Sequence, residues 1–487
     1  MIRTRICLYV LLLTPLIVYW QTIFHDFGLH DDYALLHAVR ESPGQVVKAC
    51  SAHGRPLTGA LLETSLAVTD DVSQLPWLRL TTVSLLTLLG LAIWRQLYQS
   101  GWTEVEAAAI GLGVTLLPAA QITAGWASRW PDALALLLAV AGFSAIETEL
   151  ERGGLKRFVA LLGGAMIYAL ATLVIPTNVF FAIVPITAVL LVRSGREPLS
   201  EVKWLGFHLG ALFTGVAVSF LLLQTLTSSG VFAEATGMQW EAHPIAKIGW
   251  FFTQPLPDAL ALFALRGTAG IGAVLFWSAA LGSMIIIAAG FWSMARDPAA
   301  VKSRKWLWCV VLLPVLAHGV GLLTAERSTT YGLLFPLSSL VIVLVLHSLR
   351  VLTTAREIKP LFHYLALGLL AAGAALVASR NTFVHIAEPQ GRDWELVKTM
   401  VLHANFTKPT SVFIITPATG QAAERHPYGD SSGLLPGDSV SWSVEMLKAA
   451  LHERFGKKLP KGGSFTVETG HERPSNKTYD VVIDLRL

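Results

Sequence analysis

The sequence predicts an all-α polytopic membrane protein of about 11 transmembrane helices, followed by a small α/β domain outside the membrane. Three observations support this fold class. Charged residues make up 14% of the 487 residues and hydrophobic residues 53%, with a mean hydropathy of +0.56, whereas soluble proteins carry roughly 25% charged residues. Eleven apolar runs come close to the ~20 residues that a helix needs to cross a bilayer. From about residue 379 onward the composition becomes charged and rich in turn residues.

The eleven apolar runs are interpreted as the spanning helices of one membrane domain, residues 1–378. The first run follows Arg3 and Arg5 and resembles a signal peptide, but no small-x-small cleavage site closes it, so we expect a retained helix. The run at 178–192 is the shortest, which leaves a tilted helix, a partly re-entrant helix or an extension across Pro176 open. The runs fall at about 6–24, 77–94, 104–122, 129–146, 158–175, 178–192, 204–225, 270–294, 306–322, 332–348 and 361–378.

The positions of lysine and arginine predict which loops face the cytoplasm. If the N-terminus is cytoplasmic, the inner segments hold 16 Lys and Arg, and the short outer loops hold little besides Arg129 and Arg327. This bias agrees with the positive-inside rule. The long loops 25–76 and 226–269 and the tail 379–487 then lie on the extracytoplasmic side. Because the inner connections are short, we expect any chemistry on the outer face.

The C-terminal tail, residues 379–487, reads as a small extracytoplasmic α/β domain. Helical spacing predicts helices at 391–405 and 440–455, apolar runs predict strands at 411–416 and 479–485, and a Gly/Pro-rich loop is expected at 417–438. No nucleotide-binding fingerprint joins these elements. The chain has no basic tract, so nucleic acid is not an expected partner. Its three cysteines predict no disulfide framework.

The first outer loop, 25–76, holds the most prominent polar motif, the adjacent acids Asp31 and Asp32. In a helix neighbouring side chains diverge by about 100°, so both carboxylates cannot enter one pocket without distortion. We expect one to face an active site and the other to cap a helix at 33–40, where a carboxylate accepts backbone N–H bonds. The alternative is that both are cap residues in a hydrated loop.

The same loop continues with His53, Gly54, Arg55 and Pro56 ahead of a predicted helix at 57–67. An arginine here can hold a carboxylate or a phosphate in a bidentate fork, and the alternative is a snorkelling or loop-pairing arginine. His53 is a candidate proton donor or ligand, although a loop histidine is more often only solvated.

Three other outer loops supply candidate substrate-binding residues. Arg129 and Arg327 keep their charge and can meet a lipid phosphate, and Arg327, near Tyr331, is favoured for this role; either arginine could instead anchor the interface. Lys247 precedes an apolar stretch at 248–265 that is broken by Pro255 and Pro257. That stretch predicts helices lying in the membrane interface, where they could wall a lipid-binding groove.

These motifs resemble those of a known family. The acidic pair Asp31–Asp32 after the first span, the following Gly-Arg-Pro-Leu at 54–57, and the span that opens Pro-Trp-Leu-Arg-Leu at 76–80 are similar to the GT-C superfamily of membrane glycosyltransferases. Within it, the chain resembles the bacterial glucosyltransferases that modify lipopolysaccharide or O-antigen, which are related to serotype-converting phage enzymes. The resemblance covers the membrane part, 1–378, and leaves the tail outside.

The resemblance implies an enzyme of the bacterial inner membrane with its C-terminal domain in the periplasm. Such a hexosyltransferase moves a sugar from a polyprenyl-phosphate donor to a glycan, lipid or protein hydroxyl. Asp31 then corresponds to the general base and Asp32 to its partner. Some GT-C enzymes use a divalent metal, for which Asp31, Asp32 and His53 would be the ligands. Because these are too few for a metal site, we expect no cofactor.

Two other function classes remain open from the sequence. A transporter is expected to show repeated halves and charged or broken helices near the middle of the bilayer, and neither is evident. A polysaccharide polymerase or a non-catalytic scaffold of the cell envelope would not need Asp31, so substitution of that residue separates it from the transferase.

Overall fold

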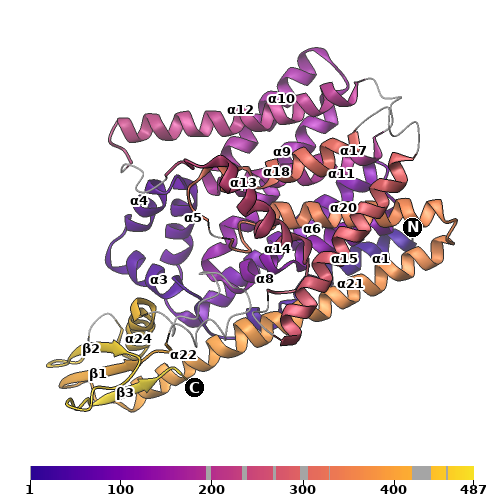
Figure 1. Cartoon of the computed structure of the whole chain (residues 1–487). Coiled ribbons are helices and arrows are strands. Elements are labelled where there is room, and N and C mark those ends of the chain that lie inside the picture. The colour runs from indigo at the N-terminus through magenta and orange to yellow at the C-terminus, as the bar shows by residue number, and fades with distance from the viewer. Residues whose placement is uncertain are drawn as a thin grey trace.

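A computed structural model describes residues 2–193, 199–232, 239–266, 270–296, 305–327, 329–418, 440–456 and 459–486. The chain is mostly helical and has one three-stranded sheet close to its C-terminus (Figure 1). The predicted loop at 417–438 lies outside the described residues from 419 onward.

The apolar runs form helices, of which seven in the described part of the chain are long and apolar enough to cross a membrane. An eighth span is obtained if α7 and α8 count as one helix bent by 53°. Three shorter apolar helices, Thr4–Val18, Asn178–Val192 and Trp308–Ala317, coincide with the remaining predicted runs. The long helices are α6 (Leu75–Gln99), α9 (Trp130–Leu150), α10 (Gly154–Val174), α12 (Glu201–Ser228), α15 (Gly270–Ala295), α20 (Phe335–Ala355) and α21 (Pro360–Thr382).

The bend between α7 (Glu104–Leu116) and α8 (Pro118–Gly125) has a local cause in the sequence. Leu117 precedes Pro118 and takes an extended conformation, with ψ 153°. A proline ring clashes with a helical conformation of the residue before it. The second helix of the pair is fully buried and leads directly into the outer loop at 126–129.

Loops that were predicted to share a face of the membrane meet at the same end of the helical bundle. The first-loop helices α3 (Asp32–Glu41), α4 (Gln45–Ala52) and α5 (Pro56–Ala67) lie at the end away from the N-terminus, together with the C-terminal sheet (Figure 1). At the other end, Arg193 pairs with Glu151 at 2.7 Å and Lys305 with Glu201 at 3.6 Å. The predicted grouping of loops therefore agrees with the fold, and the compartment that each end faces stays a prediction.

The C-terminal domain is carried by a continuous helix. α21 passes through a π-helical turn at Phe383–Ala387 into α22 (Glu388–His403), so that Pro360–His403 is one helix of 44 residues. The predicted domain boundary after residue 378 falls inside this helix. The three parallel strands are β1 (Pro409–Ile415), β2 (Ser464–Gly470) and β3 (Val481–Asp484), in the order β2-β1-β3.

Strand β2 was not predicted, whereas the strands at 411–416 and 479–485 were. Its side chains alternate between exposed and half-buried positions along its length, because it is the edge of the sheet and has little apolar content to mark it. β1, at the centre, is buried over four consecutive residues and is easily recognised as a strand.

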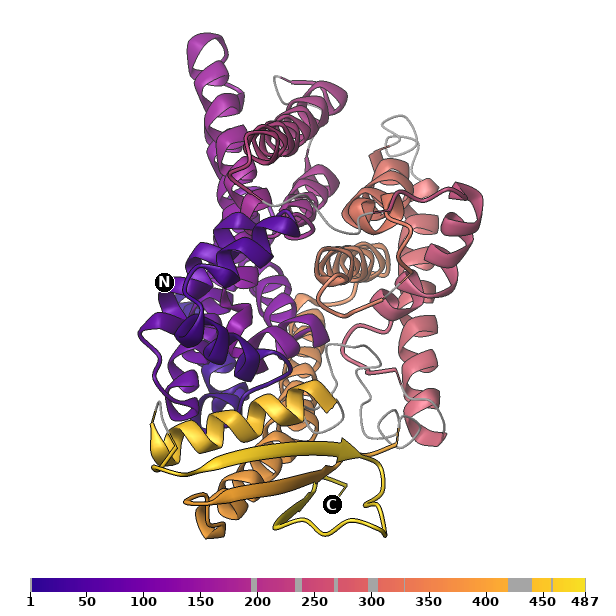
Figure 2. The same cartoon turned by 90° about the vertical axis from the view of Figure 1, so that its left-hand side faces the viewer.

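The C-terminal domain and the first outer loop share one apolar core. Its members include Leu36 of α3, Trp394 and Val397 of α22, and Met446 and Leu447 of α24 (Val440–Phe455), all at most 1% exposed. Figure 2, seen from this end, shows α24 beside the helices of the first outer loop. Burying such side chains contributes about 1.5–3 kcal/mol each relative to exposure. The two segments therefore stabilise each other.

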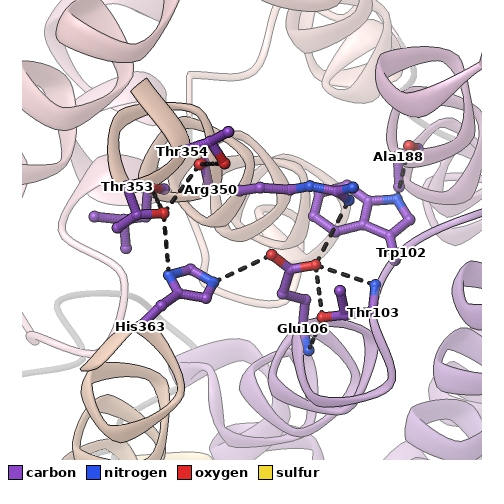
Figure 3. A network of polar contacts seen from close by, with 9 residues as sticks. Trp102, Thr103, Glu106, Ala188, Arg350, Thr353, Thr354 and His363 are labelled. Carbon is purple, nitrogen blue, oxygen red and sulfur yellow. Dashed lines mark hydrogen bonds and ion pairs between the residues drawn. The ribbon is translucent and has the colours of Figure 1, made fainter. Parts of the chain in front are cut away.

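A polar network ties three helices together at the opposite end (Figure 3). The buried Glu106 of α7 accepts hydrogen bonds from Thr103 and contacts His363 Nε2 of α21 at 3.1 Å and Arg350 Nη1 of α20 at 3.5 Å. Thr103 and Glu106 also form a reciprocal capping box that begins α7. A buried carboxylate needs such partners, since burying an unpaired charge costs several kcal/mol.

Replacing Glu106 by glutamine is expected to destabilise the protein by on the order of 3 kcal/mol, because the amide cannot balance Arg350 and presents an N–H₂ group to one of its donors. Thermal unfolding of the detergent-solubilised protein measures this effect. Glu357→Gln, in the exposed turn between α20 and α21, is the control and should unfold like the wild type. An unchanged unfolding midpoint for Glu106→Gln would show that the network does not stabilise the fold.

Candidate active site

The first outer loop is held against the membrane helices by a fully buried arginine, Arg79 of α6. Its guanidinium donates hydrogen bonds to the backbone carbonyls of Thr22, His25 and Phe27, the last at 2.7 Å, and lies 4.0 Å from the centre of the Phe27 ring. An arginine suits this position because its fork offers several donors that keep their charge. Arg79 therefore fixes the chain just ahead of the acidic pair.

Asp32 is buried, 1% exposed, and joins the first outer loop to the next one. Its Oδ2 accepts the N–H groups of Leu29 and Ala127 at 2.9 and 3.2 Å, and its Oδ1 accepts that of Ser128 at 2.9 Å. Burial, and to a smaller extent the charge of Asp31, raise the pKa of the Asp32 carboxyl to about 6, against the opposing effect of the hydrogen bonds from Leu29 and Ser128. The group is thus mostly ionised at neutral pH.

The predicted carboxylate cap on the helix at 33–40 is absent. Neither carboxylate bonds the free N–H groups of α3, and Asp31 occupies the N-cap position without a side-chain bond. Asp32 instead accepts the N–H groups that begin the 3₁₀ turn Ala127–Arg129 ahead of α9, which lack partners within their own helix. The expectation was wrong because it considered only donors close in sequence.

Asp31 is the accessible member of the pair, with 42% of its side chain exposed. Its Oδ1 accepts the indole N–H of Trp126 at 3.0 Å and the hydroxyl of Ser128 at 3.4 Å, and lies 3.8 Å from Nδ1 of His30. Among the described residues, no hydrogen bond or ion pair reaches Oδ2. One oxygen of Asp31 is therefore held by described partners, and the other has none among the described residues.

A second carboxylate and two arginines lie close to Asp31. The charges of Arg129, Arg55 and Asp31 all act on Asp132, at the start of α9. Arg129 Nε lies 3.9 Å from Asp132 Oδ2, and the guanidinium carbon lies 4.2 Å from the centre of the Trp126 ring. Nη1 of Arg129 is buried and has no hydrogen-bond partner within the described part of the chain. The guanidinium of Arg129 thus keeps one buried N–H group without a described partner.

Gly332 fits closely against Arg129. A Cβ atom at position 332 would lie 2.4 Å from Nη1 of Arg129, which is too close for any side chain unless the guanidinium moves. The neighbouring Tyr331 is buried, 4% exposed, and its hydroxyl accepts the backbone N–H of Arg266 at 2.9 Å. The loop between α19 (Gly319–Leu323) and α20 therefore reaches the site through Gly332.

Lys247 and Arg327 form a second group with partners of their own. Lys247 of α13 (Pro244–Thr253) donates to the carbonyl of Glu326 and lies 4.1 Å from the centre of the Trp250 ring, and Arg327 lies 3.6 Å from Glu241. α13 and α14 (Pro255–Leu260) are the helices expected at 248–265. A pocket behind this group is lined by Thr177, Phe180, Ala317, His318, Val320, Gly321 and Leu333.

His53 is separate from both groups. It is exposed at the end of α4, and its Nδ1 contacts the carbonyl of Ala49 at 2.8 Å. Within the described ranges, no three His, Cys, Asp or Glu side chains lie together in a way that could hold a metal ion. Whether the chemistry needs a metal stays a prediction, and no step below passes through one.

Comparison with known proteins adds little to this geometry. No protein-family model matches the sequence, and no curated protein matches it. Among solved structures, the chain is similar to that of an oligosaccharyltransferase from Archaeoglobus fulgidus, tethered by a disulfide bond to an acceptor peptide with the NVT sequon. The identity is 13% and the TM-score 0.41, over 91% of this chain and 68% of that chain. A similarity of this degree carries no conclusion about this site.

The sequence did not indicate several residues that shape the site. Three of these residues lie beside Arg129 in the sequence: Trp126, Ser128 and Asp132. The many polar and aromatic residues in that short loop could have indicated them as site residues. Arg79 was noted only as part of the motif at 76–80. The contact from Trp442 of α24 to His30, with ring centres 3.5 Å apart, joins residues about 400 positions apart and left no trace in the sequence.

The two acids are expected to differ in their contribution to stability. Asp32→Asn should destabilise the protein by about 1–3 kcal/mol, because its amide N–H₂ must face a backbone N–H that the carboxylate accepts. Asp31→Asn should change stability by less than about 0.5 kcal/mol, since the asparagine oxygen can still accept from Trp126. Thermal unfolding in detergent compares the two variants. Equal midpoints would contradict the buried role of Asp32.

Proposed function

We propose that the protein is an integral-membrane glycosyltransferase of the GT-C type, with Asp31 as the general base. It moves a hexose from a polyprenyl-phosphate donor to a hydroxyl of a cell-envelope glycan, lipid or protein. The observation that carries this proposal is the divided environment of Asp31: Oδ1 is fixed by Trp126 and Ser128, and Oδ2 is open. The resemblance of the motifs around Asp31 and Arg55 supplies the reaction class.

The proposed reaction is a single displacement at the anomeric carbon of the donor. The acceptor oxygen forms a bond to that carbon as its proton passes to Oδ2 of Asp31, and the bond from the carbon to the phosphate oxygen breaks. The electron pair leaves with the polyprenyl phosphate. Fixing Oδ1 keeps Oδ2 in one orientation, which general base catalysis requires, since the base must lie within hydrogen-bond reach of the proton.

Arg129 is the better candidate for the leaving phosphate than Arg327. Arg327 faces Glu241 and is 44% exposed, so water and a carboxylate already balance its charge. Arg129 is 20% exposed, lies in the same loop as the residues that hold Asp31, and has a buried Nη1 with no described partner. A cation already in place where negative charge develops lowers the barrier more than one that must first be released.

The described groups also suggest how the donor lies. The pocket lined by Phe180, His318 and Leu333 offers apolar walls, and Leu333 follows Gly332, which touches Arg129. Asn178, ahead of the same wall, donates to the backbone carbonyl of Asp132 at 3.1 Å. We propose that the donor lies along this apolar wall, with its phosphate toward Arg129 and with Lys247 and Tyr331 behind it.

Asp31→Asn is expected to lower sugar transfer by at least about 100-fold, because an amide cannot accept the acceptor proton and general bases contribute 10²–10⁴-fold. The measurement is the mass of lipopolysaccharide and other envelope glycans from cells that produce each variant, where the wild type adds an increment of one hexose.

Asp70→Asn is the matched control, since Asp70 is an exposed carboxylate of the same loop, and it should leave the increment intact. Retention of the hexose increment in Asp31→Asn cells, with the protein present in membranes at the wild-type level, would contradict the transferase proposal.

Gly332→Ala tests the role of Arg129 without a change of charge. The added methyl group must displace the Arg129 guanidinium, which is the flexible end of a side chain, so stability should change little. We expect the KM for a polyprenyl-phosphate hexose to rise about 10-fold in membranes. Gly368→Ala, which has no atom near its Cβ position, is the control. Unchanged donor kinetics in Gly332→Ala would argue against Arg129 as the phosphate ligand.

A further inference from the structure

A stack of aromatic and cationic side chains links the C-terminal domain to Asp31. The ring of Trp442, in the first turn of α24, lies 3.5 Å from that of His30, and the His30 ring lies 4.7 Å from that of Trp126. The guanidinium carbon of Arg129 lies 4.2 Å from the centre of the Trp126 ring. Trp126 is also the residue that donates to Oδ1 of Asp31. The stack therefore ends on the side chains that define the site.

His30 is held in an unusual conformation. Its φ of 52° lies in the left-handed region, which residues other than glycine seldom adopt and which persists only where the surroundings impose it. Its ring lies between Trp442 and Trp126, and its Nδ1 is buried without a hydrogen-bond partner among the described residues. Ring packing, rather than hydrogen bonding, fixes this side chain.

The strained residue immediately precedes the base. Any relaxation of the His30 backbone would turn Asp31 relative to Trp126 and Ser128, which belong to the neighbouring loop. The shared core of α24, α22 and α3 holds the helix that carries Trp442. The C-terminal domain thus contacts the site through the ring of Trp442. The position of this ring depends on the core packing of α24, which lies away from the acidic pair.

We infer that Trp442 is a positioning residue for the proposed transfer, and that the C-terminal domain completes the active site by clamping His30 and so orienting Asp31. This inference rests on the proposed function. It assigns the domain a part in the reaction rather than the role of a separate acceptor-binding module. Trp442 acts through His30 and does not itself have to touch the sugar.

The test is a double-mutant cycle on the full-length protein in membranes, with His30→Ala, Trp442→Ala and the combined variant. The assay is transfer of labelled hexose from a polyprenyl-phosphate hexose to the envelope fraction of cells lacking the protein. Each single change should lower kcat about 10-fold and leave the KM for the donor unchanged, and the combined variant should be no slower than either one. Coupled residues are expected to deviate from additivity in this way.

Hydrogen exchange of the purified protein supplies a readout that does not depend on activity. Trp442→Ala should speed amide exchange at residues 29–33, and Trp442→Phe, which keeps a ring, should restore both protection and kcat. Tyr479→Ala, which changes a half-buried aromatic residue of the same domain bonded to Glu468, is the control and should change neither. Trp442→Leu replaces the alanine variant if that variant does not fold.

The outcomes separate this inference from the proposed function. Full turnover and unchanged exchange in the Trp442 variants, or losses that multiply in the combined variant, would overturn the clamp while Asp31→Asn still abolished transfer. Transfer that survives Asp31→Asn would overturn the proposed function, and the exchange at residues 29–33 would then decide whether Trp442 orders the loop.

Discussion

The site depends on hydrogen bonds to the backbone of the first outer loop, at the point where this loop turns back over the membrane helices. Two buried ions of opposite sign do this: Arg79 binds three carbonyls of residues 22–27, and Asp32 accepts three N–H groups from residues 29, 127 and 128. Unpaired backbone groups in such surroundings would each cost about 1–3 kcal/mol. Once these groups are paired, the first two outer loops form one rigid support, and Asp31 projects from it.

Two adjacent acidic residues with different surroundings can have different roles, one structural and one chemical. Asp32 uses both oxygens to hold loops together, whereas Asp31 uses one and leaves the other open. Arg129 shows the same division, because Asp132 and the Trp126 ring hold part of its guanidinium and Nη1 is unpartnered among the described residues. A carboxylate and a cation held in this way need little reorganisation when charge develops beside them.

Hydropathy and charge bias predicted the helices and the grouping of loops, since both depend on composition over long windows. The acidic pair was found because it is local, and so were α3 and α5. The long-range contacts were not predictable: Asp32 caps a turn almost a hundred residues away, and the rings of His30 and Trp442 meet across most of the chain. Arg327 was favoured for a phosphate from its position, but the sequence could not show that Glu241 faces it and that Nη1 of Arg129 is buried without a described partner.

The continuous helix Pro360–His403 has a mechanical consequence for the C-terminal domain that it carries. At 1.5 Å per residue its 44 residues form a rod of about 66 Å, with a π-helical turn as its one irregularity in place of a pliable tether. The C-terminal domain is mounted at the end of this rod. Any tilt of the rod would therefore displace the sheet and α24 by an amount that grows with its length.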